Sequence, residues 1–88
     1  MFNAMNRENL INASIYLENK LDEAHVEKVA LKKEFRTYQI KDPEAKGLPF
    51  TTAEFRYVVE KLIEEGKIKI FGGGSVITNF IGTRIYRP

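Results

Sequence analysis

Apolar residues near the N-terminus recur at three- and four-residue spacing, which predicts a helix over about residues 6–21. Asn6 is a favourable N-cap for this helix. One apolar stripe is formed by Leu10, Ala13, Ser14, Leu17 and Leu21. Ile11 and Ile15 lie roughly 100–140° around the helix from Leu10, at about 100° per residue. The helix is therefore either central in the core or able to offer a second apolar face to a partner.

The second apolar face suggests a specific hypothesis. Phe2 and Met5 precede the helix and could join Ile11 and Ile15 in a homodimer contact. Central burial of the helix is the competing interpretation.

The pattern between residues 25 and 38 is ambiguous. Val26, Val29 and Ala30 suit one helical face, whereas Leu31, Phe35 and Tyr38 suit another. A short strand near His25–Val29 followed by a helix over about residues 30–38 explains both sets, and one continuous helix from Glu23 explains them less well. Residues 39–49 contain Asp-Pro and Gly-Leu-Pro, which predicts a loop.

The helix over about residues 52–65 is the element that the pattern predicts most clearly. Thr51 and Glu54 form a capping box, and Phe50 and Phe55 occupy the flanking positions of a hydrophobic staple. Gly66 ends the helix in the left-handed conformation that glycine adopts most easily. The buried stripe of this helix is predicted to comprise Phe55, Val58, Val59, Leu62 and Ile63.

A β-hairpin is predicted over about residues 67–87. Lys67–Phe71 alternates charged and apolar residues, as a half-buried strand does. Gly72–Gly74 opens a turn, and Val76–Ile81 and Thr83–Arg87 are two further extended runs.

Length and composition indicate one small domain spanning residues 1–88. The sequence has no cysteine, so disulfides and thiolate metal sites are excluded. It has no apolar run of about 18 residues, and we expect no membrane partner. Because its N-terminus also lacks the apolar stretch of a signal peptide, we expect a cytoplasmic protein.

The net charge of +2 conceals an asymmetry along the chain. Residues 1–65 hold 10 Lys and Arg against 12 Asp and Glu, which sums to −2. Residues 66–88 hold four basic residues and no acid, which sums to +4. A basic end on a nearly neutral body is typical of a nucleic-acid footprint, although a charged sheet edge that resists aggregation has the same composition.

Catalytic chemistry has few candidate residues. His25 is the only histidine, and most glutamates fall on solvent-facing helix positions. Gly72–Ser75 lacks the lysine of a phosphate-binding loop and precedes a strand. No spacing matches a zinc or calcium site. We therefore expect a protein that is not an enzyme and has no metal site and no cofactor.

Tyr57 is an unusual residue in the predicted helix 52–65. With Phe55 at the centre of the buried face, Ala53, Tyr57, Glu60 and Glu64 point to the opposite side. A tyrosine ring in mid-helix gains nothing by facing water, so Tyr57 indicates either a contact surface or cover by another part of the chain.

The order of elements resembles the winged-helix family of helix-turn-helix DNA-binding domains. The resemblance rests on Thr51–Gly66, on Lys67–Phe71 and on the returning run Thr83–Tyr86, and it is vague before residue 39. It implies an α+β fold with three helices and a small antiparallel sheet, or wing, at the C-terminus. It also implies binding of double-stranded DNA, with the helix 52–65 as the recognition helix.

The resemblance assigns the DNA-contacting residues in three groups. The recognition helix would contribute Thr52, Ala53, Arg56, Tyr57 and Lys61. The preceding helix would hold phosphates through Lys32, Lys33 and Arg36. The wing would contribute Lys69, Ser75, Thr78, Asn79 and Arg84.

The sequence departs from the family pattern in two ways. About ten loop residues separate the second and third predicted helices, and the candidate recognition helix carries four glutamates against Arg56 and Lys61. Two hypotheses follow. The first is a homodimeric DNA-binding protein, a transcriptional regulator or a replication or partition factor, whose affinity falls by roughly two to three decades between about 50 and 200 mM salt. The second is a winged-helix module that binds another protein, as an inhibitor or assembly subunit, through Tyr57 and the acidic helix face.

Overall fold

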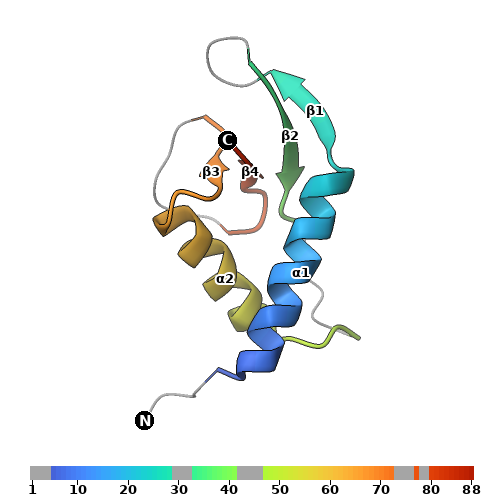
Figure 1. Cartoon of the computed structure of the whole chain (residues 1–88), viewed down its shortest axis with the longest axis vertical. Coiled ribbons are helices and arrows are strands. Elements are labelled where there is room, and N and C mark those ends of the chain that lie inside the picture. The colour runs from blue at the N-terminus through green and yellow to red at the C-terminus, as the bar shows by residue number, and fades with distance from the viewer. Residues whose placement is uncertain (1–4, 29–32, 42–46, 73–76, 78–79) are drawn as a thin grey trace.

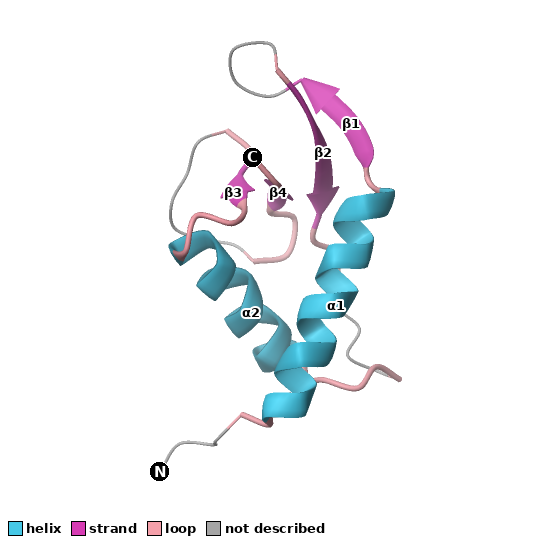
Figure 2. Ribbon diagram, viewed as in Figure 1, coloured by secondary structure: helices cyan, strands magenta, loops and turns pink. Residues whose placement is uncertain are grey.

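The computed structural model describes residues 5–28, 33–41, 47–72, 77 and 80–88. In these residues the chain is a small α+β domain with two helices and a four-stranded antiparallel sheet (Figures 1 and 2). The elements follow the order α1 (Arg7–Glu23), β1 (His25–Lys28), β2 (Glu34–Gln39), α2 (Thr52–Glu64), β3 (Lys69–Ile70) and β4 (Arg84–Tyr86).

Helix α1 begins where the sequence predicts. The Asn6 side chain accepts hydrogen bonds from the backbone N–H groups of Glu8 and Asn9, at 2.8 and 3.3 Å, and so satisfies two free donors of the first turn. The helix ends at Glu23, and the next residue, Ala24, has an extended backbone conformation. Ala13, Leu17 and Leu21 form its buried stripe, which confirms the predicted one in part.

Helix α2 is also the predicted one. Thr51 Oγ1 accepts a hydrogen bond from the Glu54 backbone N–H at 3.1 Å, and the Glu54 carboxylate accepts one from the Thr51 N–H at 2.7 Å. The rings of Phe50 and Phe55 stack 5.8 Å apart across this cap, which confirms the hydrophobic staple. Gly66 follows the helix with φ at +76°, the left-handed conformation expected of a helix stop.

The Glu54 carboxylate also joins the beginnings of the two helices. Besides capping α2, it accepts hydrogen bonds from the Asn6 backbone N–H at 3.2 Å and from the Asn9 side-chain amide at 3.1 Å. These N–H donors, the Thr51 N–H first among them, hold the pKa of Glu54 below its ordinary value, and its burial opposes them only in part. As Figure 1 shows, the helices start at the same end of the molecule and diverge toward the sheet.

The predicted helix over residues 30–38 is wrong for the part that the structure describes. Residues 34–39 form strand β2, and residues 29–32 lie outside the described chain. Phe35 and Tyr38 are three residues apart, which suits a helix, but in a strand that odd spacing directs them to opposite faces. Phe35 packs on the Tyr86 ring at 4.9 Å, and Tyr38 packs against the core, so tertiary partners decide the conformation. The shorter strand predicted near His25–Val29 is confirmed as β1.

The sheet has the order β1-β2-β4-β3. Tyr38 of β2 is paired with Ile85 of β4, and Ile70 of β3 is paired with the same residue. Ile85 is fully buried in the core, so this face of the sheet lies on the helices. Thr37, Tyr86 and Lys69 are paired across the three strands on the opposite face.

The predicted C-terminal hairpin is confirmed in β3 and β4, but its strands are shorter than predicted. Residues 73–75, from the predicted turn, and residues 76, 78 and 79, from the predicted extended run, lie outside the described chain. Phe80 and Ile81, from the same run, lie in a bend and a turn. Gly82 completes this turn, since its backbone N–H donates to the Ile40 carbonyl at 2.6 Å and its φ is +93°.

Aromatic rings fill the space between the helices and the sheet. Phe55 is 1% exposed, and its ring lies 5.7 Å from Tyr16, 5.8 Å from Phe50 and 5.8 Å from Phe80. These contacts join α1, the loop before α2, α2 itself and the turn before β4. No helix in the described part of the chain has the length and apolar character needed to cross a membrane.

Candidate functional site

The outward face of α2 carries the predicted recognition residues. Thr52, Ala53, Arg56, Tyr57 and Lys61 are all exposed. However, the Arg56 guanidinium pairs with Glu60 at 2.9 Å, and the Lys61 ammonium pairs with Glu64 at 3.3 Å. The Glu64 carboxylate raises the pKa of Lys61, which holds the lysine in its charged form. Each cation on this face is therefore matched by an anion on the same helix.

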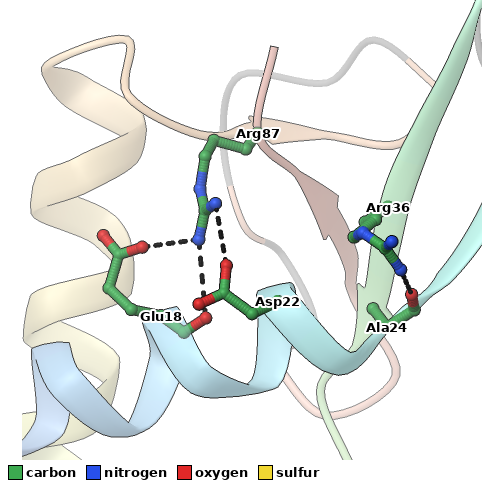
Figure 3. A network of polar contacts seen from close by, with 5 residues as sticks. All are labelled: Glu18, Asp22, Ala24, Arg36 and Arg87. Carbon is green, nitrogen blue, oxygen red and sulfur yellow. Dashed lines mark hydrogen bonds and ion pairs between the residues drawn. The ribbon is translucent and has the colours of Figure 1, made fainter.

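The hairpin end of the chain does not keep its positive charge free. Arg84 pairs with Glu27 of β1, and Lys67 pairs with Glu65 at 3.5 Å. Arg87 reaches back to α1 and contacts Glu18 at 2.5 Å and Asp22 at 3.1 Å (Figure 3). Lys69 has no ion pair among the residues that the structure describes. Three of the four basic residues behind the +4 asymmetry are thus neutralised by acids elsewhere in the fold.

The predicted wing cations also lie apart from the face of α2. Lys69 is paired with Tyr86, and Arg84 is two residues from Tyr86 on the same strand, so both lie on the face of the sheet opposite the helices. The Arg84 guanidinium stacks on the Phe71 ring at 4.6 Å. The outward face of α2 does reach the turn before β4, because Arg56 lies over the Phe80 ring at 5.6 Å.

The remaining predicted DNA contacts are placed as follows. Lys33 is exposed immediately before β2, and Arg36, on β2, donates to the Ala24 carbonyl at the end of α1, at 2.9 Å (Figure 3). Their predicted location on a helix is wrong, because Lys33 directly precedes β2 and Arg36 lies within this strand. Lys32, Ser75, Thr78 and Asn79 lie outside the described residues.

A groove between α1 and α2 has an apolar lining. Its volume is about 320 Å³. Leu10 and Ile11 line it from α1, and Tyr57, Val58 and Leu62 line it from α2. Its rim holds Arg7, Lys61 and Lys67 together with Glu65.

Exposed apolar side chains continue this groove on α1. Ile11 is 52% exposed and Ile15 is 53% exposed, so the second apolar face predicted for α1 is not covered by the described chain. Met5, at the start of the helix, is 39% exposed. Phe2, the fourth residue of the predicted dimer contact, lies outside the described residues.

Two features that lie far apart along the sequence meet at this groove. The exposed tyrosine on α2 and the second apolar face of α1 are each visible in the periodicity, but nothing local indicates that they adjoin. Arg7 and Lys67 were not predicted as site residues, because their place on the rim depends on how the helices pack.

Comparison with protein-family models, with curated proteins and with solved structures finds no match to this chain. Its function must therefore be argued from its own residues.

Proposed function

We propose that this chain is a non-enzymatic, cytoplasmic protein-interaction module whose binding site is the groove between α1 and α2. The observation that carries the proposal is the combination of this apolar groove with the half-exposed side chains of Ile11 and Tyr57 along it. A contiguous apolar surface with a polar rim is typical of a protein-docking site.

The shape and charge of the groove favour an amphipathic helix as the occupant. Two helices form its walls, and a third helix can lay its apolar face between them. The rim carries Arg7, Lys61 and Lys67 against Glu65, and Glu64, which pairs with Lys61, reduces the net charge of these five groups to +1. We therefore propose a partner helix that carries acidic residues beside its apolar face, since complementary charges speed and orient docking.

A second copy of the chain is a less favourable occupant. In a two-fold dimer through this groove, the same patch of both copies would meet. The rim cations of one copy would then approach those of the other, and like charges oppose such a contact. Homodimerisation through Met5, Ile11 and Ile15 is thus the competing outcome.

Fluorescence anisotropy with two labelled synthetic peptides tests the proposal. One is an amphipathic helix of leucine and glutamate, and its matched control replaces every glutamate with lysine. We expect the acidic peptide to bind and the basic peptide to bind at least about tenfold more weakly, a difference of about 1.4 kcal/mol. Equal affinities would remove the argument from charge.

Variants locate the binding surface in the same assay. Ile11→Ala and Tyr57→Ala should each weaken binding of the acidic peptide, because they remove apolar surface from the groove. Val26→Ala is the matched control, since Val26 is 49% exposed on β1 and does not line the groove. Sedimentation equilibrium of the free protein reports the homodimer: self-association lost in Ile11→Ala would identify a second copy as the occupant.

Binding of duplex DNA, with a winged-helix arrangement in which α2 is the recognition helix, is the second candidate. The contact between Arg56 and Phe80 favours it, because it joins the exposed N-terminal half of α2 to the turn before β4. The pairing of Arg56 with Glu60 does not exclude a phosphate, since an exposed pair of this kind contributes only about 0–1 kcal/mol. The regulatory, replication or partition role belongs to this candidate.

The salt dependence of binding to a random 30-base-pair duplex tests the second candidate. If Arg56 and Lys61 supply two phosphate contacts, affinity should fall by about one decade between 50 and 200 mM salt. If Lys69 and Arg84 also engage, the fall should be about two decades. Absence of binding at the lower salt concentration would exclude this candidate, whereas the peptide experiment would be unaffected.

A further inference from the structure

A second cavity lies where the last two turns of α1 meet the end of β2, away from the groove. Its volume is about 510 Å³. Tyr16 and Lys20 line it from α1. Thr37, Tyr38 and Gln39 line it from β2, and Lys41 lies two residues after the end of that strand. His25 and Arg84 complete the charged and aromatic part of its wall.

The wall of this cavity is basic. Lys20, Lys41 and Arg84 line it, and no aspartate or glutamate is among the described residues of its lining. Lys20 is half-buried, and neither Lys20 nor Lys41 forms an ion pair with any described residue. Arg84 is paired with Glu27, so within the described part of the chain the cavity cations without an ion pair are the two lysines.

The cavity also offers aromatic and hydrogen-bonding groups. The Lys20 ammonium lies 5.3 Å from the centre of the Tyr16 ring, and that ring and the one of Tyr38 both line the space. Thr37 and Gln39 also line it, and their side chains donate to the carbonyls of Phe35 and Gly82, each at 3.3 Å. Lysine ammonium groups favour an anion, while a tyrosine ring gives a planar group a surface on which to stack.

We propose that this cavity binds a phosphate monoester of nucleotide size, with the phosphate between Lys20 and Lys41 and the planar base against the tyrosines. A volume of about 510 Å³ falls within the range of about 300–1,000 Å³ typical of small-molecule sites. The end of α1 opposes an anion through its helix dipole, but that effect is about 0.3–1 kcal/mol per charge and falls off within the last turn. The inference is independent of the proposed docking groove, since the two sets of lining residues do not overlap.

Titration of the isotope-labelled protein with AMP, adenosine and inorganic phosphate, followed by amide chemical shifts, tests the proposal. AMP should shift the amides of Thr37, Tyr38 and Gln39 saturably and bind more tightly than either of its parts. Lys20→Ala and Lys41→Ala should each weaken AMP binding by about tenfold, because each removes a charge-assisted contact. Lys28→Ala is the matched control, since Lys28 is exposed on β1 and does not line the cavity.

Three outcomes would overturn the proposal. Adenosine binding as tightly as AMP would show that the phosphate is not recognised. Equal losses of affinity in Lys28→Ala and the two cavity variants would show a general charge effect. If the cavity amides respond to the 30-base-pair duplex but not to AMP, the site binds the phosphodiester backbone of a nucleic acid and not a phosphate monoester. The amide spectrum of each variant reports whether it is folded, so a loss of binding can be separated from a loss of structure.

Discussion

The base of the molecule and its sheet end are stabilised by different kinds of polar contact. At the base, where α1 and α2 begin, one buried carboxylate accepts hydrogen bonds from Thr51, Asn6 and Asn9, next to a cluster of aromatic rings. At the sheet end, a half-buried ion pair joins β4 to β1, and exposed ion pairs join the C-terminus to α1. The base therefore relies on burial and hydrogen bonding, whereas the sheet end relies on charges that water can replace.

This difference shows where basic residues remain available for a ligand. Arg84 and Arg87, near the C-terminus, form ion pairs with acidic residues elsewhere in the fold. Lys20 and Lys41 have no carboxylate partner among the described residues. Charge counted along the sequence is therefore a poor guide to charge presented on the surface of this protein.

Truncation of an aromatic ring at the base should have the largest effect. Phe55 is 1% exposed and contacts three other rings, so Phe55→Ala should lower the free energy of unfolding by about 3–5 kcal/mol. Urea denaturation measures the loss. Phe35→Ala is the counterpart at the sheet end, where the ring is half-buried and contacts Tyr86, and its cost should be smaller. Equal costs would remove the contrast between the two regions.

Acid should weaken the base through Glu54. Its pKa in the folded protein is lowered from the ordinary value of 4.5, chiefly by the Thr51 N–H, so its charged form stabilises the fold at and above that pH. This contribution is lost as the pH falls below 4.5 and through the folded-state pKa. We expect the melting temperature to fall more steeply with acidification in the wild type than in Glu54→Gln. Parallel curves would show that other carboxylates dominate acid unfolding.

Removal of an ion pair at the sheet end should have the smallest effect. Arg87 is 44% exposed and its partners Glu18 and Asp22 are more exposed still, so Arg87→Ala should cost less than about 1 kcal/mol. The difference from wild type should shrink at high salt, which screens exposed charges. Thermal denaturation at low and high salt measures both quantities. A salt-independent loss above about 2 kcal/mol would show that the C-terminus is held by packing rather than by charge.

The parts of the fold predicted correctly depend on local chemistry. The Asn6 cap, the Thr51–Glu54 capping box and the Gly66 stop each involve groups a few residues apart, so the sequence contains the whole interaction. The exposure of Tyr57 and the second apolar face of α1 were also visible in the helical periodicity. For each half of the candidate site the sequence left exposure and cover as alternatives, and it did not predict the contact between the halves.

The amino-acid sequence by itself determined where α1 and α2 begin and which of their faces are apolar, because helix caps and helical periodicity are satisfied within one or two turns. Only the tertiary structure decided that residues 34–39 form a strand, since β2 needs β1 and β4 as hydrogen-bonding partners and β4 lies more than 40 residues away. The same holds for the pairing of Arg84 with Glu27 and of Arg87 with Glu18. Such contacts depend on how distant segments pack, and neither composition nor spacing records that arrangement.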